Sequence, residues 1–177
     1  VRNMVLRPED FTEQAQEVLT SSQELVRQYR HSQWDVEHVL LALLQLERGV
    51  PVEVMEALGV DVAAMKARVD QSLEDTAKLA HESGQIYASP RAVRAVENAK
   101  AEADRLKDEF IGTEHMLIGC VMVQDGASTD IFKEFGIDQE KVYQALQQVR
   151  GDARVTDQRA ESKYRALEKY SVDLTAL

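Results

Sequence analysis

The sequence has few of the residues that break helices and almost no cysteine. Its 177 residues include three prolines and eight glycines, which permits long uninterrupted helices. The single cysteine, Cys120, cannot form a disulfide within the chain, which favours a reducing compartment. No run of about 18 apolar residues occurs, so we expect no transmembrane helix. The first residues also lack the apolar stretch of a secretory signal, and we expect a cytoplasmic protein.

The chain also lacks an excess of positive charge. Its formal net charge is −10, and its lysines and arginines are scattered among aspartates and glutamates. Proteins that bind nucleic acids normally carry a basic surface that displaces counterions from phosphates, and anionic membranes attract basic segments. We therefore expect neither a nucleic acid nor a membrane as a partner.

What the chain does contain is enough apolar material for a core made of helices. Apolar residues make up 44% of the sequence. Alternation of apolar and polar residues, which is typical of strands, is scarce, and runs of β-branched residues are absent. The composition therefore predicts an all-α fold.

An internal repeat organises the sequence. A shift of 77 residues superposes positions 11–75 on positions 88–152 without a gap. The identical residues fall where helices are expected to start and stop, and the apolar positions between them also match. We interpret the pattern as a duplication, which predicts two four-helix repeats related by a pseudo-twofold axis.

The start and stop signals of the four expected helices occur in both repeats. The second helix of each repeat is apolar on nearly every side, which predicts a position in the interior. The signals are Thr12 and Ser89 as N-caps of the first helices, Val36 and Thr113 at the starts of the second, Gly59 and Gly136 after the third, and Asp61 and Asp138 as N-caps of the fourth.

The composition changes after Gly151. Residues 152–163 are charged and lack a consistent apolar face, and apolar spacing resumes only at Leu167, Tyr170 and Leu174. We therefore assign residues 1–151 to the helical domain. Residues 152–177 are interpreted as a linker, separable from the core, that leads toward a module outside this sequence.

Three motifs carry a family resemblance. Residues 110–119 (FIGTEHMLIG), their diverged copy at 33–42 (QWDVEHVLLA) and the opening 10–19 (DFTEQAQEVL) resemble the Clp repeat domain at the N-terminus of Clp ATPases. Residues 154–177 look like the linker that follows this domain in ClpB-type disaggregases. The GTEH motif is more typical of the ClpC branch, so the closeness to ClpB-type proteins depends mainly on the tail.

The resemblance implies a docking domain on a homohexameric AAA+ ATPase with a chaperone role in protein disaggregation and the stress response. Such a domain binds unfolded or aggregated clients, or adaptor proteins, and the ATP and Mg²⁺ belong to other modules. The present sequence has no Gly-x-x-x-x-Gly-Lys-Ser/Thr phosphate loop, and none of its glycines precedes a lysine. We therefore expect neither a cofactor nor catalysis in this chain.

The resemblance also implies which residues bind clients. Matched residue by residue, Thr12, Asp108 and Glu114 belong to the client surface, with Glu37 as the first-repeat counterpart of Glu114. The physical expectation is that two helix starts, one from each repeat, meet there and that Asp108 and Glu114 are exposed. His31 stands where the first repeat would need the equivalent of Asp108, so an acidic groove would be lopsided. A simpler alternative is that both glutamates only complement the dipole of their own helices.

In ClpC-type relatives the glutamate pair helps to recognise phosphorylated arginine. Gly112 and Thr113 offer backbone N–H groups at a helix start, which is a favourable place for an anion. The first repeat has Asp35 there, and its carboxylate would repel a phosphate. A phosphoarginine reader is therefore the alternative function, at the second repeat only.

The histidines and the cysteine do not form a recognisable metal or catalytic pattern. Neighbours such as Glu114 and His115 diverge by about 100° on a helix, and no Cys-x-x-Cys or His-x-x-x-His spacing occurs. A small hydrolase that uses Glu114 and His115 would need a nucleophile or metal set that the sequence does not offer. We interpret His38 and His115 as structural residues, Cys120 as a buried apolar residue and Trp34 as part of the core.

Overall fold

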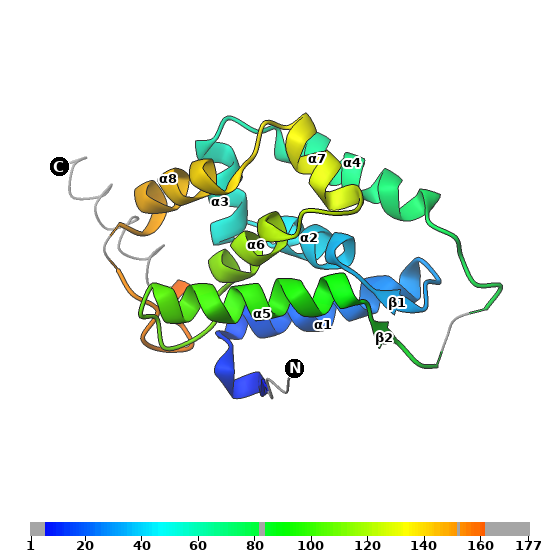
Figure 1. Cartoon of the computed structure of the whole chain (residues 1–177), viewed down its shortest axis with the longest axis horizontal. Helices are drawn as coiled ribbons and strands as arrows, with labels where there is room; N and C mark the ends of the chain where they lie inside the picture. The colour runs from blue at the N-terminus through cyan, green and yellow to red at the C-terminus, as the bar shows by residue number, and fades with distance from the viewer. Residues whose placement is uncertain (1–5, 82–83, 152, 162–177) are drawn as a thin grey trace.

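The computed structural model describes residues 6–81, 84–151 and 153–161 (Figure 1). This part of the chain contains eight α-helices and one short 3-10 helix, Pro8–Asp10. The first repeat supplies α1 (Glu13–Gln28), α2 (Val36–Gln45), α3 (Val50–Ala57) and α4 (Val62–Asp75), and the second supplies α5 (Pro90–Arg105), α6 (Thr113–Met122), α7 (Ala127–Glu134) and α8 (Gln139–Arg150).

The predicted all-α fold of two four-helix repeats is confirmed. Each helix of the second repeat begins 77 residues after its counterpart in the first. The only strands in the described residues are β1 (Gln33–Trp34) and β2 (Tyr87–Ala88), which pair in parallel with Trp34 opposite Ala88. An isolated bridge pairs Phe11 with Ile111. Phe11 and Trp34 match Ala88 and Ile111 under the 77-residue shift, so the shift converts one pairing into the other. A pseudo-twofold axis between the repeats requires this relation.

The helices begin where the capping residues predict. The Thr12 hydroxyl accepts a hydrogen bond from the N–H of Ala15 (3.1 Å), and the Ser89 hydroxyl accepts one from the N–H of Ala92 (3.0 Å). These bonds satisfy backbone donors that have no partner inside the helix. Asp61 and Asp138 cap α4 and α8 in the same way.

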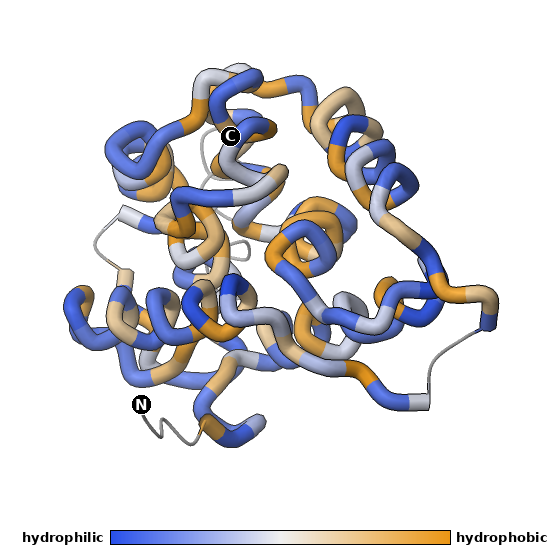
Figure 2. Tube along the Cα trace, turned by 45° about the vertical axis from the view of Figure 1, so that its right-hand side comes forward, coloured by the Kyte–Doolittle hydropathy of each residue, from blue (hydrophilic) through white to orange (hydrophobic). Residues whose placement is uncertain are grey.

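Helices α2 and α6 form the centre of the domain, as their apolar sequences predict. Every residue of α2 from Val36 to Leu44 and of α6 from Thr113 to Val121 is buried. Figure 2 shows the apolar residues gathered toward the middle of the molecule. Burial raises the pKa of the Cys120 thiol to about 12, so this residue is an apolar part of the core. Trp34 is also buried, and its indole N–H donates to the Ser22 hydroxyl (2.8 Å).

Residues 153–161, which we call the strap, pack against the helices (Figure 1, orange). The N–H of Glu109 donates to the carbonyl of Val155 (2.7 Å), and the N–H of Glu13 donates to that of Gln158 (2.9 Å). Val155 and Ala160 are buried. The strap is thus in contact with the helical core, while the separability of the chain after Gly151 and the domain boundary stay predictions. The tail's apolar spacing at Leu167, Tyr170 and Leu174 lies outside the described residues.

Candidate docking site

Two helix starts from different repeats meet at each of two places. The N–H of Thr12 donates to the carbonyl of Ile111 (3.0 Å), which places the start of α1 beside the start of α6. The N–H of Ser89 donates in the same way to the carbonyl of Trp34 (2.9 Å), beside the start of α2. We call the α2/α5 junction site one and the α1/α6 junction site two.

Site one is filled by an arginine of the domain itself. The Arg91 guanidinium binds Asp35 (2.8 Å) and Glu37 (2.9 Å) and also donates to the Ser128 hydroxyl. The N–H of Ser128 donates to Glu37 Oε2 (2.8 Å), so both oxygens of Glu37 are engaged. Burial alone would raise the pKa of Glu37, but the hydrogen bonds and charge of Arg91 outweigh it and lower the pKa.

Glu37 is therefore engaged within the domain, and its role in client binding stays a prediction. Its side chain is 9% exposed and serves as the partner of Arg91 across the two repeats. Arg91 itself was missed by sequence reasoning. A possible signal was its position in the first turn of α5, where a cation opposes the helix dipole unless a carboxylate compensates it.

Site two has the same helix starts but lacks these partners. The positions that match Arg91 and Ser128 hold Gln14, which carries no charge, and Pro51, which has no N–H. Glu114 is 1% exposed, and its Oε2 accepts from Arg150 (3.1 Å). Its Oε1 is buried and has no hydrogen-bond partner within the described part of the chain. Such an oxygen is costly to bury and is a feature of sites that bind a donor.

Asp108 joins site two through a network of charged groups. Its carboxylate contacts His115 Nε2 (2.7 Å), the Arg150 guanidinium (2.7 Å) and the N–H of Val155 (2.8 Å). Burial alone would raise its pKa, but these three hydrogen bonds outweigh it and lower the pKa to about 2. His115 Nδ1 accepts from the N–H of Gly112 (2.8 Å), so Nε2 carries the hydrogen and donates to Asp108.

The strap places its own carboxylate at the start of α6. Glu161 Oε2 accepts from the N–H of Thr113 (2.9 Å) and from the Thr113 hydroxyl. Burial, and next the charge of Glu114, raise the pKa of Glu161. The start of α6 thus holds a carboxyl group through Thr113, whereas the N–H of Gly112 is used by His115.

The structure brings Thr12, Asp108 and Glu114 to one junction but does not expose them. Thr12 is fully buried, and Asp108 is 7% exposed. The expectation that Asp108 and Glu114 lie open to solvent is wrong, because Arg150 binds both carboxylates and the strap covers the junction. Their role in client binding stays a prediction.

The first-repeat counterpart of the Asp108–His115 pair is a pair of histidines. His38 Nδ1 accepts from the N–H of Asp35 (3.0 Å), and His38 Nε2 lies 2.9 Å from His31 Nδ1. Burial, and next the charge of His31, lower the pKa of His38 to about 4. Site one therefore holds a pair of histidines where site two holds a histidine that donates to a carboxylate.

This pair predicts a loss of stability in mild acid. The unfolded histidine titrates near pH 6.5 and the folded one near pH 4, so the unfolded chain binds more protons between these values. The free energy of unfolding should therefore fall as the pH drops through this window, on the order of 2 kcal/mol between about pH 7 and about pH 5. Denaturant unfolding at the two pH values measures it.

A matched pair of variants assigns the effect. His38→Gln keeps an acceptor for the N–H of Asp35, as in a capping box, and should remove most of the pH dependence. His81 is exposed, and His81→Gln should leave the pH dependence of stability unchanged. Equal slopes in the two variants would contradict the assignment.

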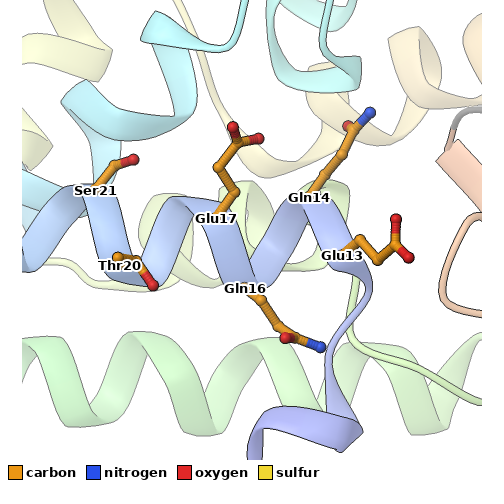
Figure 3. A pocket seen from close by; sticks show the side chains of 6 residues that line it. All are labelled: Glu13, Gln14, Gln16, Glu17, Thr20 and Ser21. Carbon is orange, nitrogen blue, oxygen red and sulfur yellow. The ribbon is translucent and has the colours of Figure 1, made fainter.

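A polar surface pocket lies along the first half of α1, beginning directly after Thr12 (Figure 3). Figure 3 shows Gln14 and Glu17 on one side of the helix and Gln16 and Thr20 on the other. A lining without apolar side chains is unlike a small-molecule site. Its lining residues are Glu13, Gln14, Gln16, Glu17, Thr20 and Ser21.

Within residues 6–81, 84–151 and 153–161, no group of three or more His, Cys, Asp or Glu side chains is placed to hold a metal ion. The helices among these residues are also too short or too polar for any of them to cross a membrane.

Comparison with known proteins defines the class. The family model of the Clp repeat N-terminal domain matches residues 10–135, and the chain belongs to this family. Among curated relatives, chaperone protein ClpB of Rhodopirellula baltica is 36% identical over 176 residues, which cover 98% of this chain and 20% of that protein. ClpB of Bacillus anthracis is 32% identical over 94% of this chain and 19% of that protein. The chain thus spans about a fifth of the length of these relatives.

Solved structures agree on the fold. The N-terminal domain of Hsp104 from Candida albicans matches with a TM-score of 0.77 at 22% identity, covering 86% of this chain and 99% of that one. A complex of the ClpV N-domain with a VipB peptide matches with a TM-score of 0.66 at 16% identity, covering 88% and 99%.

Proposed function

We propose that this domain docks unfolded or aggregated client proteins, or an adaptor, for a ClpB-type disaggregase. The parent protein would be a cytoplasmic, homohexameric AAA+ ATPase in which other modules bind ATP and Mg²⁺. The similarity to ClpB proteins along nearly the whole chain supports this proposal. A related N-domain, that of ClpV, is known in complex with a peptide, which supports peptide docking as the activity.

The observation that supports site two as the client-binding site is a difference between the equivalent residues Glu37 and Glu114. Both oxygens of Glu37 are engaged by Arg91 and Ser128, whereas Glu114 keeps a buried oxygen without a partner among the described residues. A client N–H, lysine or arginine can supply the missing donor. Site one shows within the same fold that a guanidinium fits such a glutamate.

The neighbouring residues suit a peptide. Thr113 lies beside Thr12 at the start of α6, where its N–H and hydroxyl can hold a client carbonyl or carboxylate. Asp108 is already committed to His115 and Arg150, so we assign it the role of fixing Arg150 beside Glu114. No catalytic step is proposed, because the site is arranged to hold groups by hydrogen bonds.

The test is Glu114→Gln, which removes the charge and keeps the shape of the side chain. We expect about a tenfold loss of affinity for reduced, carboxymethylated α-lactalbumin, since hydrogen bonds to charged groups contribute about 1.5–3 kcal/mol. Fluorescence anisotropy measures binding, and thermal melting checks the fold. Glu140→Gln is the matched control, because Glu140 is an exposed residue of α8. Equal affinities of the two variants would exclude Glu114 from the client site.

A phosphoarginine reader remains the alternative. It is favoured by one feature of site two, where the start of α6 holds a carboxylate directly beside Glu114. A phosphate and a guanidinium would thus find complementary groups side by side. Tighter binding of a phosphoarginine peptide than of the same peptide with arginine would favour this function over general client docking.

A further inference from the structure

We propose that the strap is a displaceable occupant of site two, so that a docked strap and a docked client exclude each other. The contact between Glu161 and Thr113 would hold the strap in place, and we call this contact the latch. The client part of this statement rests on the proposed function, whereas the latch rests on the contacts of the strap alone. The strap would then regulate how often the site is open.

The first reason is access. Thr12, Thr113 and Glu114 are at most 1% exposed while the strap is in place. Glu161 occupies both the N–H and the hydroxyl of Thr113. A client group cannot reach these donors, or the unpartnered oxygen of Glu114, unless the strap leaves.

The second reason is that hydrogen bonds, rather than apolar packing, hold the strap. Backbone bonds join it to Glu13 and Glu109, and the N–H of Val155 donates to Asp108. The side chains of Arg154, Gln158 and Arg159 also bind the carbonyls of Leu106 and Phe11 and the carboxylate of Glu13, respectively. Its buried apolar side chains are those of Val155 and Ala160, both small. Segments with few buried apolar contacts open locally at a lower cost than the domain unfolds.

The third reason is the repulsion built into the closed state. Glu161 and Glu114 are buried side by side, and each has an oxygen without a hydrogen-bond partner in the described part of the chain. The positive end of α6 attracts Glu161, while the neighbouring carboxylate repels it. The closed strap therefore keeps two carboxyl groups buried next to each other, a cost that is relieved when the strap opens.

Hydrogen exchange on the whole chain tests the latch. In Glu161→Ala, the amides of Glu13, Glu109 and Val155 should exchange about tenfold faster, because a hydrogen bond to a charged group is lost. Val155→Ala removes an apolar anchor instead and should act in the same direction. Glu140→Gln should leave these rates unchanged.

Client binding tests the exclusion. If opening becomes about tenfold more frequent, the dissociation constant for carboxymethylated α-lactalbumin should fall by about the same factor. Saturating client should also speed exchange of the strap in the unmodified chain. Melting curves identify a variant that is merely unfolded, and the two loosening variants act at different residues, so one remains informative if the other fails to fold.

The unfavourable outcomes are distinct. Unchanged exchange in both Glu161→Ala and Val155→Ala overturns the latch. Faster exchange with unchanged client affinity, or protection of the strap by client, overturns the exclusion. Absence of client binding in every form of the chain overturns the proposed function and the exclusion together, while the exchange rates still report on the latch by itself.

Discussion

Arg91→Met should destabilise the domain by about 3–5 kcal/mol, the largest loss that we expect from a single side chain here. The methionine has a similar length but cannot pair with Asp35 or Glu37. Glu37 would then remain buried as an unpaired carboxylate, which costs more than the pair itself contributes. Denaturant unfolding at neutral pH measures the change.

The same helix offers the control. Arg94 pairs with Asp125, but both side chains are about half exposed, and Arg94→Met should cost only about 0–1 kcal/mol. The double variant Arg91→Met, Glu37→Met should recover most of the loss, because the carboxylate that remains, Asp35, is 26% exposed and keeps its hydrogen bond from Ser89. Similar losses for Arg91→Met and Arg94→Met would show that the link between the repeats is not a major source of stability.

Gly119→Ala should lower the melting temperature by roughly 5–10 °C, which corresponds to about 2–3 kcal/mol. A Cβ at this position would lie 2.3 Å from the carbonyl oxygen of Ala95 and 3.1 Å from the nitrogen of Ala99. Both are backbone atoms of α5, so α5 and α6 would have to separate. This cost exceeds the gain of about 1 kcal/mol in helix propensity.

Ala42 is the matched residue of the first repeat and provides the comparison. It is buried in α2 and already carries a methyl group. Ala42→Gly should therefore cost only about 1 kcal/mol from helix propensity, plus the loss of the buried methyl. A stabilising Gly119→Ala would mean that α5 and α6 adjust their packing without penalty.

The repeat fold could be predicted because its signals are local. Thr12 and Ser89 cap their helices with their own side chains. The sequences of α2 and α6 are apolar on nearly every side, which predicts that both helices lie in the interior. Such features depend on residues three or four positions apart, which one sequence displays. The meeting of two helix starts could be anticipated only from the family resemblance.

The contacts within the two sites could not be predicted in this way. Arg91 finds Glu37 across the two repeats, and nothing near either residue identifies its partner. The packing of the strap is even harder to predict from the sequence. Its buried residues, Val155, Ala160 and Glu161, do not follow the spacing of a helix or a strand. Burial of Asp108 and Glu114 follows from these distant partners, which is why both were expected to be exposed.

The arginine that fills site one has a consequence for stoichiometry. A duplicated domain with twofold symmetry would start with two equivalent junctions, and hence with two binding sites on each chain. Arg91 acts as an internal ligand for one of them, so the domain is monovalent if clients bind site two as proposed. In an assembly of such chains, avidity would then scale with the number of subunits rather than with twice that number. Placing glutamine at position 91, as at position 14, would free Glu37 for a second ligand, at a cost in stability like that of Arg91→Met.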